Sequence, residues 1–435
     1  MANQTLTVTV EKLVQGGRGL ARLDKQVLFV RGAIPDEQVS VVIGAQHKGF
    51  QEATISDVLV ASPDRVTPPC PVYEICGGCQ LQHIRYEAQL VQKTSILKET
   101  LARVGKLTVE DILPVIPSPD PYGYRSTVRF VVFRSGKRFA LGFHREGTNE
   151  PVAAAGCLLV TEGIRKIAAA VSERLAAQRK LPLRLESIEI RHSRAFGHGL
   201  LVFRSGKTDK EQAVQLFEFF KDLPDVAGLV VTSESNGRGK RAQRWVTGQD
   251  WIADRLGDLI FRIGDRSFMQ ANWRLNELLS RTVADWAGAT PGLRVLELYA
   301  GVGTLGLTLA RAGALVTLVE ANPYALADAR HAAKSNHIGR CRFRPLLAEV
   351  MLETVQSGEY DLVLVDPPRT GLSQECLREL LRIGPARLLY LSCDPATLAR
   401  DLGRLCTSGY RTARLQPFDM FPQTAHLEAL VELER

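Results

Sequence analysis

The stretch "LELYAGVGTLGL" (296–307) combines a strand-like apolar run, a glycine-containing loop and the beginning of a helix. Gly301 and Gly303 would let the backbone approach a ligand closely. The next strand-like segment, "VTLVE" (316–320), places Glu320 about twenty residues beyond the loop, where an acidic residue can hold ribose hydroxyls. The loop and the acidic residue together favour a nucleoside cofactor over a purely structural turn.

Strand-like and helical segments alternate around this stretch from about residue 285 to the C-terminus. Such alternation predicts a doubly wound α/β fold with a mostly parallel sheet, in which ligands bind at the carboxyl ends of the strands. We therefore expect a Rossmann-like domain over 256–435. Its strand-like segments are "RVLELYAG", "LVTLVE", "YDLVLVDPP", "RLLYLSC" and "HLEALVEL".

Three side chains lie at the ends of these predicted strands. Asp366 precedes two prolines that fix a rigid turn, at a point where cofactor and substrate would meet. Cys393 precedes a helix N-terminus, whose dipole is expected to lower the thiol pKa and to favour a nucleophile. Glu428 lies among apolar residues, where an acidic side chain needs a catalytic task or an ion-pair partner, and position alone favours the ion pair.

The N-terminal half has a different pattern. Short strand-like segments separated by turns predict a small β-barrel over 1–61. Strands mixed with helices predict a central α+β domain over 62–255, in which the basic segment "NGRGKRAQRW" (236–245) is expected at a hairpin tip. Gln270 and Asn272, in "SFMQANW", are expected to cap the helix that follows or to contact a ligand.

Residues 84–105 have the periodicity of a helix, which we expect to pack on the C-terminal domain. Its predicted apolar face carries Ile84, Val91, Leu97, Leu101 and Val104.

The chain has 435 residues and a net charge of +8, so we expect two to four domains. A positive charge favours a polyanionic partner, of which nucleic acid is the usual one, although an ordinary basic enzyme is equally compatible with it. No apolar run approaches the roughly 18 to 20 residues that cross a bilayer, and the N-terminus lacks the pattern of a signal peptide. We expect a cytoplasmic protein with no membrane partner.

The segment "CPVYEICGGCQLQH" (70–83) places Cys70, Cys76 and Cys79 within ten residues. Such a group could form a disulfide, a zinc site, part of an iron–sulfur ligand set or a reactive nucleophile. In a reducing compartment, clustered cysteines favour a metal or catalysis over a disulfide.

Five short motifs occur in order along the chain: "SFMQAN", "LYAGVGT", "VDPPR", "SCDPATLARDL" and "FPQTAHLE". Together they resemble those of the RNA uracil-C5 methyltransferases that use S-adenosylmethionine, and the resemblance extends over nearly the whole chain. The N-terminal barrel resembles a TRAM domain. The cysteine segment, together with Cys157, resembles the ligand set of a [4Fe-4S] cluster found in many members.

The resemblance implies a role for each candidate residue. Cys393 would add to C6 of the target uracil, and Glu428 would remove the C5 proton after methylation. A further cofactor contact near 346–349 has no clear match in "PLLAEV", and Asp394 stands where many members have asparagine. The implied S-adenosylmethionine contacts are Gln270, Tyr299, Thr304, Glu320 and Asp366.

The four cysteines Cys70, Cys76, Cys79 and Cys157 would then hold the cluster. Their spacing of five residues, then two, then a distant fourth fits a cubane cluster better than the paired spacing usual for zinc, although zinc remains an alternative. With every position filled by cysteine, the cluster would tie the segment after the barrel to the region of Cys157 rather than carry the reaction.

The expected substrate is RNA, and 23S ribosomal RNA is the first choice because members with both a TRAM domain and a cluster are commonest in that branch. The alternatives are a T-loop uracil of transfer RNA and a non-catalytic iron–sulfur RNA-binding protein. A cytosine-C5 methyltransferase would carry a second cysteine after the fourth strand, where "DPPRTG" has none. We expect a monomer.

Overall fold

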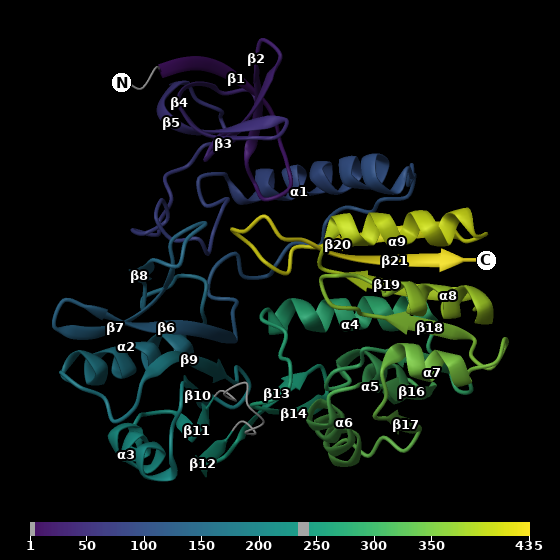
Figure 1. The fold of residues 1–435 in the computed structure, drawn as a ribbon. Helices are drawn as coiled ribbons and strands as arrows, with labels where there is room; N and C mark the ends of the chain where they lie inside the picture. Colours follow the sequence, from purple (N-terminus) through teal and green to yellow (C-terminus); the bar gives the residue numbers. More distant parts are fainter. Residues whose placement is uncertain (1–4, 234–242) are drawn as a thin grey trace.

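The structure, a computed structural model, describes residues 5–233 and 243–435. A barrel, a central sheet and a C-terminal sheet follow one another along the chain (Figure 1). Most of the basic segment expected at 236–245 lies outside the described residues. Among the described helices, none combines the length and the apolar character needed to cross a membrane.

The N-terminal strands close into a barrel in the order β1-β2-β3-β5-β4, as the strand pattern predicts. Alternate residues of β1, including Val8 and Val10, point into its apolar interior. Where the chain leaves the barrel, the buried carboxylate of Glu37 accepts two hydrogen bonds of 2.6 Å from Arg65. The barrel strands are β1 (Thr5–Leu13), β2 (Gly19–Leu23), β3 (Gln26–Arg31), β4 (Gln38–His47) and β5 (Phe50–Val60).

The central sheet has the order β12-β11-β10-β9-β6-β7-β8, and helices α2 and α3 contribute to its apolar core. Thr161 and Asp209 cap these helices through side-chain hydrogen bonds to backbone N–H groups. The elements of this region are β6 (Thr127–Ser135), β7 (Arg138–His144), β8 (Pro151–Ala153), α2 (Glu162–Ala176), β9 (Leu185–His192), β10 (Gly199–Ser205), α3 (Lys210–Phe220), β11 (Val226–Ser233) and β12 (Arg244–Gly248).

A hairpin of β13 (Trp251–Leu256) and β14 (Leu259–Gly264) leads into α4 (Trp273–Ala287). The side chain of Asn272 accepts a hydrogen bond from the Leu275 N–H and caps α4, which confirms the capping expected for this residue.

The C-terminal sheet has the order β17-β16-β15-β18-β19-β21-β20, in which β21 runs antiparallel to both β19 and β20 and the pairs from β17 to β19 are parallel. This is the predicted doubly wound fold. Helices α4, α5 and α6 contribute to the core on one face, and α7, α8 and α9 to the core on the other. The elements are β15 (Arg294–Leu298), α5 (Thr304–Arg311), β16 (Leu315–Val319), α6 (Pro323–Ser335), β17 (Cys341–Arg344), α7 (Ala348–Thr354), β18 (Leu362–Val365), α8 (Gln374–Ile383), β19 (Arg387–Ser392), α9 (Pro395–Thr407), β20 (Arg411–Phe418) and β21 (Glu428–Glu434).

The apolar pattern of the sequence does not predict two strands of this sheet, β17 and β20. Strand β17 has four residues that are half-buried or exposed, so it lacks the apolar run that marks a buried parallel strand. Strand β20 carries Gln416 and Pro417, pairs with β21 on one side, and accepts isolated bridges from Ile112 and Ile116 on the other. Polar residues inside these strands explain why neither has a strong sequence signal.

Helix α1 (Tyr86–Thr100) lies beside α9 and continues into a π-helical turn, Leu101–Gly105 (Figure 1). Its predicted apolar face is wrong at two positions, because Val91 is 65% exposed and Val104 is 50% exposed. Gln89 and Lys93 are buried instead. Polar partners from the connection between β20 and β21 make this burial possible, and those partners lie more than three hundred residues away in the sequence.

Candidate active site

Four of the sequence-predicted residues meet at the carboxyl edge of the C-terminal sheet. Glu320 follows β16, Asp366 follows β18 and Cys393 follows β19. In the antiparallel pairing of β19 with β21, Ser392 lies opposite Ala429. The next residues along these two strands are Cys393 and Glu428, so the topology brings the expected nucleophile and the expected base together.

The backbone of the glycine loop after β15 has a conformation that lets a ligand approach it closely. Tyr299, Gly301 and Gly303 have φ values of 62°, 56° and 80°, in the left-handed region that favours glycine. A Cβ on Gly303 would lie 2.9 Å from the side chain of Leu318, so a larger residue does not fit there.

Glu320 is fixed beside this loop by two backbone donors. Gly301 N–H donates to Oε2 over 2.9 Å, and Asn322 N–H donates to Oε1 over 2.7 Å. Each carboxylate oxygen keeps a further lone pair, which can accept a hydrogen bond from a ribose hydroxyl. Glu320 therefore has the geometry that the sequence pattern predicts for a nucleoside-binding acid.

Buried carboxyl groups dominate the electrostatics near Cys393. Burial raises the pKa of Glu428 well above its ordinary value, and the charge of Asp366 raises it further. Burial raises the pKa of Asp366 to about 7. Arg369 acts in the opposite direction on Glu428. An ionised Glu428 is therefore a stronger base than an exposed glutamate, which suits proton removal from carbon.

The expected lowering of the Cys393 pKa is wrong. Burial raises the pKa of this thiol to about 11, and the charges of Glu428 and Asp366 contribute in the same direction, whereas Arg369 opposes them. The Asp394 carboxylate also caps α9, by accepting from the N–H groups of residues 396 and 397 at 3.0 and 2.9 Å. The positive end of the helix is thus already occupied by an anion.

Glu297, in β15, is a residue of this region that the sequence reasoning missed, although an acidic side chain inside the apolar run "VLELY" was the available signal. Burial raises its pKa to about 8, and the charges of Asp366 and Glu320 add to the effect. Its Oε2 atom is buried and has no hydrogen-bond partner within the described part of the chain. With a pKa of about 8, Glu297 is mostly protonated at neutral pH, so it adds a buried neutral carboxyl group to this region rather than a negative charge.

The remaining expected cofactor contacts are Tyr299, Thr304 and Gln270. The half-buried phenol of Tyr299 lies near Cys376 and Glu349, and Glu349 accepts a hydrogen bond of 2.6 Å from Ser373. Glu349, of the unmatched segment 346–349, therefore lies near Tyr299 of the glycine loop. Thr304 begins α5 and Gln270 precedes α4, and both side chains are partly buried.

An arginine-lined groove adjoins this site. A cavity of about 800 Å³ lies between β6, β9 and β10 and the segment 265–269, and Asn322 beside the glycine loop also lines it. Buried Glu189 accepts hydrogen bonds from three guanidinium groups, at 2.7, 2.8 and 3.3 Å, so one negative charge orients three positive ones. The groove therefore keeps an excess of positive charge. Its arginines are Arg125, Arg129, Arg191, Arg204 and Arg266.

The four cysteines of the expected ligand set share a second cavity, of about 900 Å³. Burial raises the pKa of Cys79 to about 12, and the thiols of the other three cysteines contribute to the increase. Among residues 5–233 and 243–435, no three histidine, cysteine, aspartate or glutamate side chains are placed to hold a metal ion. The cysteines thus have a common location but not the geometry of a metal centre.

Comparison with protein families gives two matches. Residues 85–435 match the family described as tRNA (uracil-5-)-methyltransferase, and residues 1–55 match the TRAM domain. The second match coincides with the closed N-terminal barrel.

Curated relatives match over almost the full length of the chain. RNA methyltransferases described as uncharacterized, from Gloeobacter violaceus, Aquifex aeolicus and Halalkalibacterium halodurans, are 36%, 35% and 34% identical. The alignments cover 100%, 100% and 99% of this chain and 97%, 99% and 97% of those proteins.

Among solved structures, the Pyrococcus abyssi tRNA (uracil-54, C5)-methyltransferase in complex with S-adenosyl-L-homocysteine has the same fold. Its TM-score is 0.76 at 23% sequence identity, and the match covers 98% of this chain and 100% of that one.

Proposed function

Since the chain belongs to the tRNA (uracil-5-)-methyltransferase family and is an RNA methyltransferase with a TRAM domain, we propose that it methylates C5 of one uracil in 23S ribosomal RNA. The observation that carries the proposed reaction is that Cys393, directly after β19, and Glu428, at the start of β21, lie one position beyond the paired residues Ser392 and Ala429. A nucleophile and a base at one point are what C5 methylation of a pyrimidine requires.

The chemistry follows from the weak nucleophilicity of uracil C5. The Cys393 thiolate forms a bond to C6, and the electrons of the C5–C6 double bond move to C5 and O4. S-adenosylmethionine supplies the methyl group that C5 then takes up. Glu428 removes the C5 proton, the C5–C6 double bond forms again, and the bond between Cys393 and C6 breaks to return the thiolate.

The electrostatics assign a role to Arg369. A thiol with a pKa of about 11 is mostly protonated at neutral pH, so attack proceeds through a minor thiolate population. Arg369 lowers the pKa of both Cys393 and Glu428 and so favours the reactive form of each. We therefore propose that Arg369 assists the reaction by stabilising the ionised forms of Cys393 and Glu428.

We assign the cofactor site to the carboxyl edge of the C-terminal sheet, with contacts from Gln270, Tyr299, Thr304, Glu320 and Asp366. The fixed carboxylate of Glu320 beside Gly301 supports ribose binding. Asp366, whose pKa is raised to about 7, is partly ionised at neutral pH and can interact with the positively charged sulfonium centre of S-adenosylmethionine.

We assign the arginine-lined groove to the RNA backbone. An excess of guanidinium groups beside the cofactor loop can neutralise phosphates close to the reacting base. The target uracil must leave its stack to reach Cys393, which is easiest in a loop or single strand. We divide the chain accordingly into 1–61 and 62–255, which grip the RNA, and 256–435, which carries the reaction.

Substitution of Arg129, whose side chain is 54% exposed at the groove, tests this assignment. We expect Arg129→Gln to weaken RNA binding several-fold and to reduce the salt dependence by about one phosphate contact. Arg179→Gln, at an exposed position away from the groove, is the control. Equal binding by both variants in a salt titration would contradict the assignment.

We propose further that Cys70, Cys76, Cys79 and Cys157 bind a [4Fe-4S] cluster. Four thiols that line one cavity supply the donor set that such a cluster uses, and their side chains would have to move to ligand distance. The cluster would join segment 70–79 to the loop before α2. An anaerobically purified protein should contain iron and absorb in the visible range, whereas a colourless protein with stoichiometric zinc would contradict the proposal.

The second candidate substrate is a T-loop uracil of transfer RNA, which the description of the matching family favours. Methylation of total RNA that lacks the modification, followed by mapping of 5-methyluridine, separates the two substrates. A product in 23S ribosomal RNA supports the proposal, and a product in transfer RNA supports the alternative. Formation of 5-methylcytidine, or of no methylated pyrimidine, would overturn both.

A further inference from the structure

We propose that Lys93 and Gln89 of α1 are positioning residues for Glu428, because they hold the connection between β20 and β21 (419–427) from which Glu428 follows directly. The inference rests on the proposed function, since it concerns the base of that reaction. It assigns a role to a buried polar face of α1 that the reaction scheme does not use.

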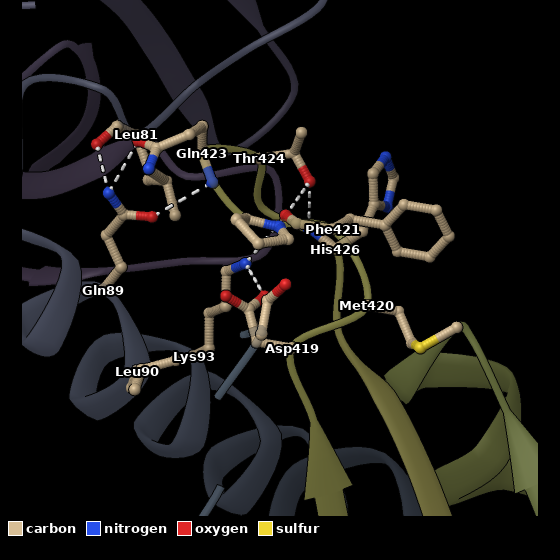
Figure 2. Close-up of polar contacts among 12 residues, drawn as sticks. Leu81, Gln89, Leu90, Lys93, Asp419, Met420, Phe421, Gln423, Thr424 and His426 are labelled. Carbon is tan, nitrogen blue, oxygen red and sulfur yellow. Dashed lines mark hydrogen bonds and ion pairs between the residues drawn. The ribbon is translucent and has the colours of Figure 1, made fainter. Parts of the chain in front are cut away.

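Lys93 forms the first contact (Figure 2). Its Nζ donates to Asp419 Oδ1 over 2.5 Å and to the Phe421 carbonyl oxygen over 3.1 Å. The side chains of Lys93 and Asp419 are 1% and 0% exposed. A buried ion pair of this kind contributes little net stability compared with apolar residues, but it fixes one register of the elements that it joins.

Gln89, one turn earlier in α1, forms the second contact. Its Nε2 donates to Gln423 Oε1 over 2.9 Å, and its Oε1 accepts from Gln423 N–H over 3.1 Å (Figure 2). Gln423 has a φ of 68°, a conformation that non-glycine residues rarely adopt. Such a backbone persists only where its surroundings hold it, and Gln89 supplies two of the hydrogen bonds that do so.

Further contacts to this connection also come from outside the C-terminal sheet. The Gln423 carbonyl oxygen accepts from the N–H groups of Gln80 and Leu81, at 3.1 and 3.0 Å. The Pro422 carbonyl oxygen accepts from the Tyr124 hydroxyl over 3.2 Å. Residues that directly follow Cys79 therefore help to hold the connection that carries the expected base.

Cys393 is positioned by different contacts. It lies between β19 and α9, where Asp394 caps the helix and Tyr390 donates to Asp401 over 2.8 Å. Loosening the connection 419–427 should therefore displace Glu428 while Cys393 stays in place. A displacement of about 1 Å can slow a reaction step by about a hundredfold. Proton removal should become slower, whereas addition of the thiolate to C6 should not.

The test compares Lys93→Met with Lys98→Met, a matched substitution at an exposed lysine of the same helix. RNA turnover, the rate of covalent adduct formation and the fraction of enzyme held as adduct during turnover are measured together. We expect Lys93→Met to lower turnover about 10- to 100-fold, to change the adduct formation rate less than about threefold, and to accumulate adduct. Lys98→Met should behave as the wild type.

A purely structural role for Lys93 would lower adduct formation and turnover by the same factor, and this outcome would overturn the inference. Unchanged turnover would overturn it as well. If Lys93→Met does not fold because Asp419 is left as an unpaired buried charge, Lys93→Met/Asp419→Asn and Gln89→Met serve instead, with the same expected accumulation. Wild type and Glu428→Gln are run beside them: if neither forms an adduct, the proposed function itself fails, independently of Lys93.

Discussion

The cysteine cavity and the Cys393 site contain the same functional group in two different settings. Four thiols line the first, together with largely apolar residues. A single thiol occupies the second, where it interacts with two carboxyl groups and a guanidinium group. The comparison teaches that the density of cysteines along a sequence indicates a shared location, whereas the charged neighbours of a cysteine indicate the reaction it can perform.

The two regions are also connected. Gln80 and Leu81, which follow the last cysteine of segment 70–79, donate backbone hydrogen bonds to the connection before Glu428. Loss of the cysteine site should therefore affect turnover indirectly, through the position of a loop. Loss of Cys393 should affect it directly.

The largest effect is expected from Cys393→Ala. Without the thiolate no bond to C6 can form, so turnover should fall by at least about 1,000-fold and the covalent adduct should disappear, while the variant still folds. Cys341→Ala, at a half-buried cysteine of the same domain, is the control. Turnover and adduct are measured by methyl incorporation and by denaturing electrophoresis. Any adduct in Cys393→Ala would place the nucleophile elsewhere.

The next largest effect is expected from Glu428→Gln. The thiolate can still add to C6 and the methyl group can still be transferred, but the C5 proton has no strong base to accept it. We expect turnover to fall about 100- to 10,000-fold while the adduct accumulates. Glu353→Gln, an exposed acid on α7, should change neither quantity. If Glu428→Gln lowered adduct formation as much as turnover, Glu428 would not act as the base.

A smaller effect is expected from Arg369 and pH. Because the pKa of Cys393 is raised to about 11, the thiolate fraction and the adduct formation rate should rise about tenfold per pH unit between pH 6 and 9. Removing the positive charge in Arg369→Leu should raise that pKa further and slow adduct formation at pH 8, and Arg369→Lys should restore much of the rate. A rate that does not change over this pH range would contradict the electrostatic description.

The smallest effect on chemistry is expected from Cys79→Ser. The variant should lose its iron and visible absorption and should unfold at a lower temperature, but turnover of the folded enzyme should fall only about three- to tenfold, through the connection 419–427. Cys406→Ser, outside the cavity, is the control. If folded, iron-free Cys79→Ser kept full turnover and wild-type stability, the cysteine site would have no structural role.

Much of the fold follows from local sequence. The alternation of apolar strands and amphipathic helices after residue 285 is strong enough to predict the doubly wound sheet, and the N-terminal strands predict the closed barrel. Strands β17 and β20 are not predicted because polar residues interrupt their apolar runs, at Arg342 in β17 and at Gln416 in β20.

The site was predicted only in part, because several of its properties depend on distant contacts. Lys93 can be buried in α1 because it pairs with Asp419. This partner lies 326 residues away, so the sequence around Lys93 gives no sign of it. Burial raises the pKa of Cys393, and the charges of Glu428 and Asp366, brought beside it by β21 and β18, raise it further; no local pattern around "LSCDP" contains those residues. Motif matching names the residues, and only tertiary structure gives their electrostatics.

The most direct test of the central claim is covalent trapping with RNA that contains 5-fluorouridine at the target position, in the presence of S-adenosylmethionine. Fluorine at C5 leaves no proton for Glu428 to remove, so the enzyme should remain bound through Cys393 after methyl transfer. We expect a denaturation-resistant complex for the wild type, with the RNA attached to the peptide that contains Cys393, and none for Cys393→Ala. Failure of the wild type to form this complex, or identical behaviour of the two proteins, would contradict the account.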